Sequence, residues 1–387
     1  MKRHVVTPRP NWQEKAEEVG FTYHTAGKMA PGDGTYWDES VAYEFSLAEV
    51  EEIEAATEEV HARCMDAADR IINDRPLMTS IGIPEFYHDY IQWSWACQDP
   101  TLYGRFDFAY DGKGPPKMLE YNADTPTMVI ETALVQWFWL QSERYGADQF
   151  NSLHEKLLDR LKEIKPLMPL GEAFYFASHR DNEEEKQTCI YLQDLAKQAG
   201  YDSRWIGIED IGILNGEFVD LDDRPVRYWF KLYPWEWLFT DGSADPAFAQ
   251  QLVSVKSGIM EPIWKCVLSN KGLLPVLHEM FPDHPNILPC YWSADRFGRQ
   301  AYVAKPLLSR EGANIEMVVD GRIIAKTDGK YHGKKIFQQK ADLFNQDGNF
   351  AVIGSWMVGN QAAGMIIRDH DREIVQDLSR VVPHWFT

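Results

Sequence analysis

The chain has 387 residues, a formal net charge of −20 and 25% charged residues, which is typical of a globular protein with two or three domains. The acidic excess argues against a general nucleic-acid binder or a binder of anionic membranes. The five cysteines are dispersed and the sequence contains no apolar run of about 18 residues, so we expect a soluble protein of the reducing cytoplasm.

The first strong element in chain order is a helix over residues 46–73. Ser46 and Glu49 have the spacing of a capping box, and Phe45 and Val50 have the spacing of a hydrophobic staple. The segment before this helix, up to about residue 44, has no regular pattern, and we expect irregular structure there. A second helix is expected over 85–97.

A β-hairpin is predicted over residues 105–122, because two alternating arms flank a turn rich in Gly and Pro. Side chains two residues apart on a strand share a face, so Arg105 lies with Asp107, and Glu120 lies with Asn122. If the two faces coincide, carboxylate and amide oxygens meet beside an arginine, and these oxygens suit Mg²⁺. A hairpin with an ordinary solvated polar face is the alternative, and alternation alone does not decide between the two.

A helical pattern over 128–145 follows the hairpin. Thr125 before Pro126 predicts an N-cap followed by proline at the first helical position. Such a helix start, just beyond Asn122, would favour an anion such as a carboxylate or a phosphate. Thr127 lies in the same segment, and capping alone would also explain the threonines.

The middle of the chain predicts a βαβ unit, with a strand over 173–177, a helix that starts at 181–182 and a strand over 205–208. No glycine fingerprint follows the first strand, so a dinucleotide site is not expected. Glu183 and Glu184 fall at the carboxyl end of that strand, where ligands of parallel sheets bind. They could hold a polyamine or another cation; a solvated first helical turn is the alternative.

The last third mixes helices and strands. Strands over 301–306 and 315–319 look antiparallel and flank a polar turn with one glycine. With Lys305 on the first strand, this arrangement could cover nucleotide phosphates, although no Walker motif is present and a surface lysine is the alternative. Further elements are expected over 264–280, 335–339, 351–358 and 361–369.

Several stretches, taken in order, resemble the synthetase region of the glutathionylspermidine synthase family, and more closely its stand-alone acid–amine ligases. The most similar stretches are residues 119–127, 230–236, 264–275, 305–314 and 353–356. The resemblance covers nearly the whole chain and implies a mixed α+β and α/β protein, with an ATP-grasp fold and a Rossmann-like pre-ATP-grasp unit. We expect an N-terminal region with the metal-binding hairpin (1–165), the Rossmann-like unit (166–262) and the nucleotide-binding part (263–387).

The resemblance also implies roles for individual residues. It assigns Asp107, Glu120 and Asn122 as ligands of two Mg²⁺ ions. It places Arg105 beside the transferred phosphoryl group and Arg368 near an acyl phosphate.

Further contacts are implied for ATP and for the two substrates. The ATP contacts are Arg105, Lys271, Lys305, the loop residues Arg310, Glu311 and Gly312, and Gln338 and Gln339 beside the adenine. The substrate contacts are Thr125 and Thr127 on the glutathione side and Glu183 and Glu184 on the polyamine side.

The function implied by the resemblance is that of an ATP-dependent acid–amine (carboxylate–amine) ligase, which forms an amide through an acyl phosphate. The expected partners are a small carboxylate, such as glutathione or a peptide, and an amine, such as a polyamine, with neither nucleic acid nor membrane. The chain shows no counterpart of the N-terminal cysteine amidase domain of bifunctional members, so product hydrolysis is not expected. An ATP-dependent phosphotransferase and a non-catalytic nucleotide-binding module are the alternatives on the same fold.

Overall fold

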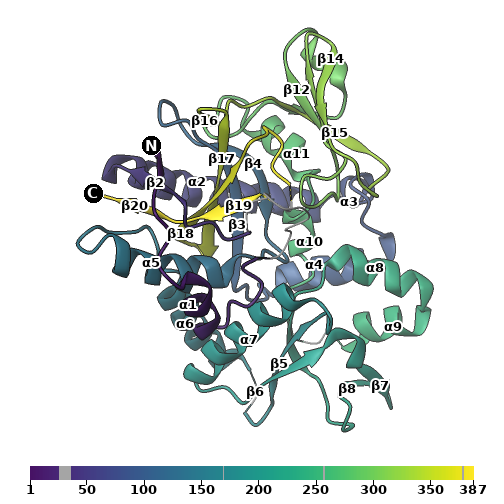
Figure 1. Ribbon diagram of the computed structural model, residues 1–387. Helices are drawn as coiled ribbons and strands as arrows, with labels where there is room; N and C mark the ends of the chain where they lie inside the picture. Colours follow the sequence, from purple (N-terminus) through teal and green to yellow (C-terminus); the bar gives the residue numbers. More distant parts are fainter. Residues whose placement is uncertain (26–35, 169, 256–257, 377–378) are drawn as a thin grey trace.

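The computed structural model describes residues 1–25, 36–168, 170–255, 258–376 and 379–387. Both termini meet in a three-stranded sheet at one side of the molecule (Figure 1), with β2 between the other two strands. The strands are β1 (Lys2–Val5), β2 (Val41–Phe45) and β20 (His384–Phe386). The start of the chain was expected to be irregular, and that expectation is wrong, because it forms β1, β2 and helix α1 (Trp12–Glu18). Pairing of β2 with β20, which is distant in sequence, stabilises the strands. Part of the segment expected to be irregular, residues 26–35, lies outside the described residues.

A six-stranded antiparallel sheet contains the predicted hairpin and the last long strands of the chain. Its order is β19-β18-β17-β3-β4, with β16 paired to β17. The bounds are β3 (Tyr103–Ala109), β4 (Lys117–Asn122), β16 (Phe344–Gln346), β17 (Asn349–Val358), β18 (Gln361–His370) and β19 (Arg380–Val382). The sheet therefore joins segments about 250 residues apart in sequence.

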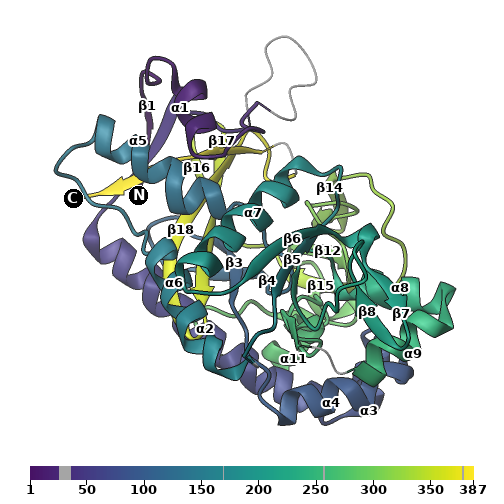
Figure 2. The ribbon, with the colours of Figure 1, turned by 90° about the horizontal axis from the view of Figure 1, so that it is seen from below.

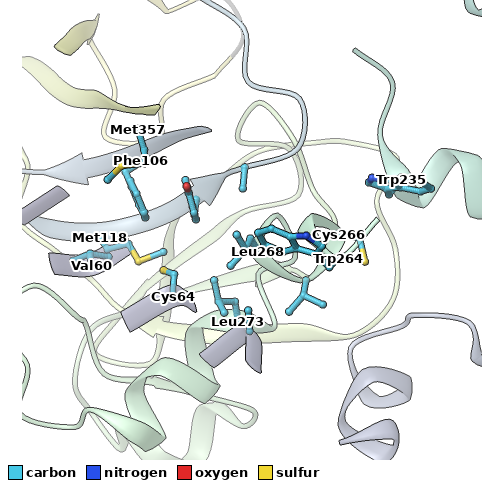
Figure 3. Close-up of a cluster of buried hydrophobic side chains, with 14 of the residues drawn as sticks. Val60, Cys64, Phe106, Met118, Trp235, Trp264, Cys266, Leu268, Leu273 and Met357 are labelled. Carbon is cyan, nitrogen blue, oxygen red and sulfur yellow. The ribbon is translucent and has the colours of Figure 1, made fainter. Parts of the chain in front are cut away.

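Helix α2 (Leu47–Ile72) packs on one face of this sheet. Its predicted capping box is present, with Glu49 N–H donating to the Ser46 side chain and Glu49 accepting from Ser46 N–H. Val60 and Cys64 pack in one buried cluster with side chains of the sheet strands (Figure 3). These sheet residues are Phe106, Met118 and Met357. Because Phe106 takes the core face of β3, the residues on either side of it point to the opposite face.

A five-stranded antiparallel sheet lies at the top of Figure 1, in the order β11-β15-β12-β13-β14. Its strands are β11 (Cys290–Tyr291), β12 (Tyr302–Pro306), β13 (Glu316–Val319), β14 (Arg322–Lys326) and β15 (Lys335–Gln339). The predicted antiparallel pairing of 301–306 with 315–319 is confirmed. The single helix expected over 264–280 is instead two, α10 (Lys265–Leu268) and α11 (Leu273–Met280).

A four-stranded parallel sheet forms the lower part of Figure 1, and it confirms the predicted βαβ unit. Its order is β10-β9-β5-β6, and α7 (Glu183–Gln198) connects the last two strands. The strands are β5 (Phe174–Ser178), β6 (Ser203–Gly207), β9 (Tyr228–Lys231) and β10 (Gly258–Met260). Figure 2 shows α6, α7 and the helices α8 and α9 around this sheet. The remaining α-helices and strands are α3 (Arg75–Ser80), α4 (His88–Ala96), α5 (Gln136–Glu143), α6 (Leu153–Ile164), β7 (Gly212–Leu214), β8 (Glu217–Val219), α8 (Trp235–Ala244) and α9 (Pro246–Val255).

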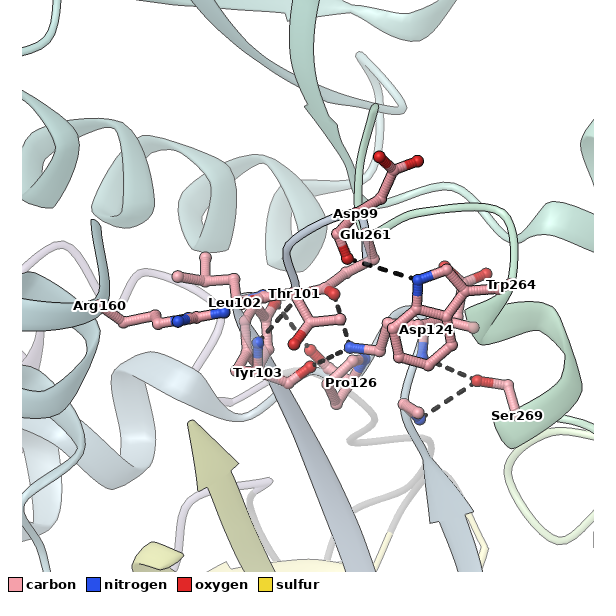
Figure 4. Close-up of polar contacts among 12 residues, drawn as sticks. Asp99, Thr101, Leu102, Tyr103, Asp124, Pro126, Arg160, Glu261, Trp264 and Ser269 are labelled. Carbon is pink, nitrogen blue, oxygen red and sulfur yellow. Dashed lines mark hydrogen bonds and ion pairs between the residues drawn. The ribbon is translucent and has the colours of Figure 1, made fainter. Parts of the chain in front are cut away.

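Buried polar contacts hold the end of the hairpin against the parallel sheet. The Asp124 carboxylate accepts from Lys231 Nζ over 2.5 Å and from Trp235 N–H over 2.9 Å. The break between α10 and α11 brings Ser269 Oγ to the backbone N–H groups of Ala123 and Asp124, at 3.1 and 2.7 Å (Figure 4). The segment after β4 is therefore fixed from two sides.

Within the described part of the chain, no helix has the length and apolar character needed to span a lipid bilayer.

Candidate active site

The polar side chains of the β3–β4 hairpin lie together on one face. Asp107 stands directly opposite Glu120, and Arg105 stands opposite Asn122. Arg105 Nε donates to Asp107 Oδ1 over 3.1 Å, and the Asn122 amide donates to Glu120 Oε1 over 3.4 Å. The two predicted faces therefore coincide, and they form the centre of the candidate site.

A β-bulge beside Asp107 connects this hairpin to the five-stranded sheet. The register shift leaves Leu119 as an extra residue of β4. Lys305 Nζ donates to the Leu119 carbonyl over 3.0 Å, and Gln338 Nε2 donates to the Met118 carbonyl over 3.0 Å. Lys305 also donates to Gln338 Oε1 over 2.7 Å. The bulge thus brings the lysine of one sheet to the carboxylates of the other.

Cations surround the two carboxylates. Lys271 Nζ lies 3.1 Å from Glu120 Oε2, and Arg368 Nη1 lies 3.6 Å from Asp107 Oδ2. Burial would raise the pKa of Glu120, but Lys271 and Lys305 outweigh it and lower that pKa to about 2. Burial lowers the pKa of the Lys305 ammonium to about 8, although Glu120 acts in the opposite direction. Glu120 is therefore ionised at neutral pH, and cationic groups lie beside both carboxylates.

The first of two cavities at this centre lies between the two antiparallel sheets. Apolar side chains from both sheets line it, and the lysine and glutamines of β12 and β15 stand along one wall. The lining includes Val303, Lys305, Gly312, Met317, Gln338, Gln339, Val352, Arg368, Asp107 and Glu120. An apolar slot with a cationic end suits a flat base attached to phosphates.

The second cavity lies between the hairpin and the parallel sheet, and it is more polar. Its lining includes Tyr36, Arg105, Asn122, Thr125, Thr127, Glu184, Glu185, Trp237, Arg310 and Glu311. Glu120 and Arg368 line both cavities. The two cavities therefore meet at the carboxylate and cation cluster.

The loop around Arg310 separates the cavities. Arg310 Nη1 donates to Thr125 Oγ1 over 2.8 Å, and Arg310 Nη2 pairs with Glu236 Oε1 over 2.6 Å. Glu311 lines the second cavity and Gly312 lines the first. Gly312 has a φ of +66°, and a Cβ added there would lie 2.2 Å from a backbone oxygen, so the loop requires glycine at this position.

The predicted substrate residues fall into two groups. Thr125, Thr127 and Glu184 line the second cavity. Glu183 lies outside its lining, on the exposed first turn of α7, where it accepts from the Thr22 hydroxyl over 2.9 Å. The substrate roles of these four residues stay predictions.

The helix after the hairpin starts later than predicted. Helical backbone begins at Val129, so Thr125 does not cap it, and its hydroxyl instead accepts from the Arg310 loop. Met128 has a φ of +76°, which turns the chain before the helix. The Thr127 carbonyl accepts from Arg105 Nη1 over 2.8 Å, so this segment orients the arginine instead of starting a helix.

Sequence reasoning missed several residues of the second cavity. Trp237 belongs to an aromatic stretch that is typical of a protein core, although Glu236, between two tryptophans, marks this stretch as partly polar. Glu236 is not part of the lining itself but pairs with Arg310, which is. Tyr36 lies in the segment expected to be irregular. Glu185 follows the two predicted glutamates and lines the cavity with Glu184.

The oxygen atoms of the hairpin form a candidate set of metal ligands. Two carboxylates and one amide, Asp107, Glu120 and Asn122, present oxygen ligands on adjacent strands. Among the described residues, no group of three or more His, Cys, Asp and Glu side chains could hold a metal. This small oxygen set fits Mg²⁺ that takes its remaining ligands from substrate phosphates and water.

Two antiparallel sheets that face each other across a cation-lined slot, beside a small parallel sheet, define an ATP-grasp type of protein. Residues 3–387 match the family described as "Glutathionylspermidine synthase preATP-grasp". The chain therefore belongs to the glutathionylspermidine synthase family.

Individual proteins agree with this assignment. A Haemophilus influenzae protein provisionally named an acid–amine ligase is 38% identical over 403 residues, covering 100% of both chains. The bifunctional glutathionylspermidine synthetase/amidase of Escherichia coli is 26% identical over 367 residues, covering 88% of this chain and 58% of its own. A glutathione synthetase-like effector of Globodera pallida has a similar fold, with a TM-score of 0.59 at 10% identity over 97% of this chain and 96% of its own.

Proposed function

We propose that the protein is an ATP-dependent acid–amine ligase that forms an amide bond through an acyl-phosphate intermediate. The observation that carries this proposal is that the two cavities share Glu120 and Arg368. One cavity suits a nucleotide and the other suits a polar acceptor, so transfer between them would occur at the shared cluster. The similarity to proteins named acid–amine ligase and glutathionylspermidine synthetase supports the same activity.

The residues around the shared cluster suit phosphoryl transfer, which requires mainly positioning and charge neutralisation. Lys271 and Lys305 would hold the ATP phosphates, and Gln338 and Gln339 would border the adenine. Asp107 and the Thr127 carbonyl orient Arg105. Its planar guanidinium would bind the transferred phosphoryl group through two parallel hydrogen bonds. In this step the substrate carboxylate oxygen bonds to the γ-phosphorus, and the bond to the ADP oxygen breaks.

The second step would take place on the acceptor side. Thr125 and Thr127 would orient the acid, and Arg368 would stay on the acyl phosphate. Glu184 would orient the amine inside the cavity, and Glu183, on the same helical turn but outside the lining, would attract it electrostatically. The amine nitrogen bonds to the acyl carbon, and phosphate leaves. The loop residues Arg310, Glu311 and Gly312 would keep water from the intermediate, because hydrolysis would leave only ATPase activity.

We further propose that Asp107, Glu120 and Asn122 hold two Mg²⁺ ions when ATP binds. The ions would neutralise phosphate oxygens and align them for transfer. When Mg²⁺ and ATP bind, Lys271 and Arg368 would have to move from the carboxylates to the ATP phosphates. The phosphates are anionic too and would replace the carboxylates as partners of these cations.

Glutathione or a peptide as the acid and a polyamine as the amine are the proposed substrates. The acidic residues Glu184 and Glu185 in the acceptor cavity favour a cationic amine. The five cysteines are free, which fits a reducing compartment, and we propose the cytoplasm. We keep the division at 1–165, 166–262 and 263–387 as a proposal, with the six-stranded sheet drawing strands from the first and third parts.

An ADP-release screen over carboxylates and amines, with mass spectrometry of new amides, tests the function. The ligase proposal predicts ADP release that requires Mg²⁺ and both substrates. A stable phosphorylated acceptor without an amide would indicate a phosphotransferase. ATP binding without ADP release in every mixture would indicate a non-catalytic module.

A further inference from the structure

A buried glutamate lies behind the wall of the acceptor cavity. Glu131 is completely buried, and its Oε1 accepts from the Tyr36 hydroxyl over 2.7 Å. Its Oε2 has no hydrogen-bond partner among the described residues. A buried carboxylate that lacks part of its hydrogen bonding is costly, so a role beyond packing is expected for it.

Tyr36 connects this carboxylate to the cavity. The tyrosine lines the cavity together with Arg105 and Glu184, and it interacts electrostatically with both. Arg105 marks the proposed phosphoryl end of the cavity, and Glu184 marks the proposed amine end. Tyr36 therefore lines the same cavity as both proposed ends.

Glu131 also opens the π-helical turn Glu131–Val135. Such turns are rare and occur frequently at functional sites. The Tyr23 hydroxyl faces the same carboxylate. The polar groups that face Glu131 are thus Tyr23, Tyr36 and Arg105, with Glu184 beside the two tyrosines.

We propose that Tyr36 and Glu131 accept the proton that the attacking amine loses, with Tyr36 touching the amine and Glu131 acting through Tyr36. The proposal rests on the ligase function. The nitrogen lone pair forms the bond to the acyl carbon. The carbon–oxygen bond to phosphate breaks, and phosphate leaves with the electron pair of that bond. The N–H proton passes to the Tyr36 oxygen while the Tyr36 proton passes to Glu131 Oε1.

The protonation behaviour of Glu131 is consistent with this role. Burial raises its pKa, and the hydrogen bond from Tyr36 and the charge of Arg105 oppose the increase. A base whose pKa approaches the working pH transfers protons most effectively.

One experiment tests the proposal without any substrate. The full-length chain is labelled with ¹³C at the glutamate carboxyls, and the Glu131 signal is identified from its absence in Glu131→Gln. We expect this signal to titrate at higher pH than the exposed glutamate carboxyls and to shift its midpoint in Tyr36→Phe. A carboxyl that stays protonated to pH 9, or that is unaffected by Tyr36→Phe, would overturn the proposal.

A kinetic experiment uses glutathione as the probe acid and spermidine and hydroxylamine as probe amines. Glu131→Gln and Tyr36→Phe should lower amide formation with spermidine about 10²-fold, which is typical of a lost general base. The remaining rate of each variant should rise with pH, while trapping of the acyl phosphate by hydroxylamine should fall far less.

The matched control is Tyr110→Phe, because Tyr110 donates to Glu52 over 2.8 Å in a similar pair that does not line either cavity. If Glu131→Gln forms the amide as fast as the wild-type protein at every pH, the proposed proton transfer is contradicted. The proposed ligase function is not affected by that result. A wild-type chain that forms no amide counts against the proposed ligase function, and the ¹³C titration then decides on Glu131 separately.

Discussion

Asp107 and Glu120 face each other across β3 and β4, and each carboxylate is paired with a cation from a more distant part of the chain. Arg368 approaches Asp107 from β18, and Lys271 approaches Glu120 from the break between α10 and α11. The two carboxylates thus stand where both antiparallel sheets and the parallel sheet converge. This position makes them the groups on which the proposed chemistry depends.

Replacing either carboxylate should abolish metal-dependent activity. We expect Asp107→Asn and Glu120→Gln each to lower Mg²⁺-dependent ADP release by about 10²–10³-fold, because phosphate charge is then left without its counter-ion. The control is Asp111→Asn, because the Asp111 carboxylate lies in the hairpin turn, where it accepts from Lys113 N–H. Full turnover in both carboxylate variants would contradict the metal assignment.

ATP affinity should fall at alkaline pH. The pKa of Lys305 is about 8 in the free protein, so its charge is present below pH 8 and is lost as the pH rises through this value. Binding of ATP favours the protonated lysine, and loss of one proton weakens affinity by up to about tenfold per pH unit above the midpoint. Equilibrium titrations with ATP between pH 7 and 10 measure this effect.

Lys305→Arg provides the comparison, because a guanidinium stays protonated over this range. ATP affinity of this variant should be nearly constant between pH 7 and 9. An identical decline in wild type and Lys305→Arg would show that another group causes the dependence.

Gly312→Ala should impair nucleotide binding through its backbone. A Cβ would lie 2.2 Å from the Val375 carbonyl oxygen, so the loop must move. Weakening a phosphate contact by about 1.4 kcal/mol would raise the KM for ATP about tenfold. Gly321→Ala is the control, since Gly321 has a φ of +74° but has no atom within 4 Å of the added Cβ. Gly321→Ala should lose about 1–2 kcal/mol of stability from its backbone conformation, and Gly312→Ala should lose at least as much. Only Gly312→Ala should change the KM for ATP.

The contact between Asp124 and Lys231 should matter for stability. Both side chains are buried, and Lys231→Met leaves the Asp124 charge without its partner. We expect a loss of about 3–5 kcal/mol in the free energy of unfolding, measured with urea. The double variant Lys231→Met/Asp124→Asn should recover part of this loss, and a double variant less stable than the single one would argue against a charge effect.

Local patterns predicted the elements of the candidate site well. Alternation gave the hairpin faces of Arg105 and Glu120, and the spacing of Ser46 and Glu49 gave the start of α2. These features depend on neighbours in sequence, so they can be deduced from short stretches. The parallel βαβ unit followed from the same kind of periodicity.

Features that depend on distant partners were missed. The bulge at Leu119 follows from capture of its carbonyl by Lys305, which is 186 residues away. The late helix start after Thr125 follows from contacts with Arg310 and Arg105. Strands at the start of the chain form because β20 supplies a partner, and no local pattern contains this information.

The most direct test of the ligase account follows oxygen atoms through the reaction. The acid is labelled with ¹⁸O in its carboxylate and incubated with ATP, Mg²⁺ and the amine. Acyl-phosphate chemistry predicts that amide and ADP form in equal amounts and that each released phosphate carries one ¹⁸O. Unlabelled phosphate, or a labelled phosphorylated product without an amide, would contradict the account.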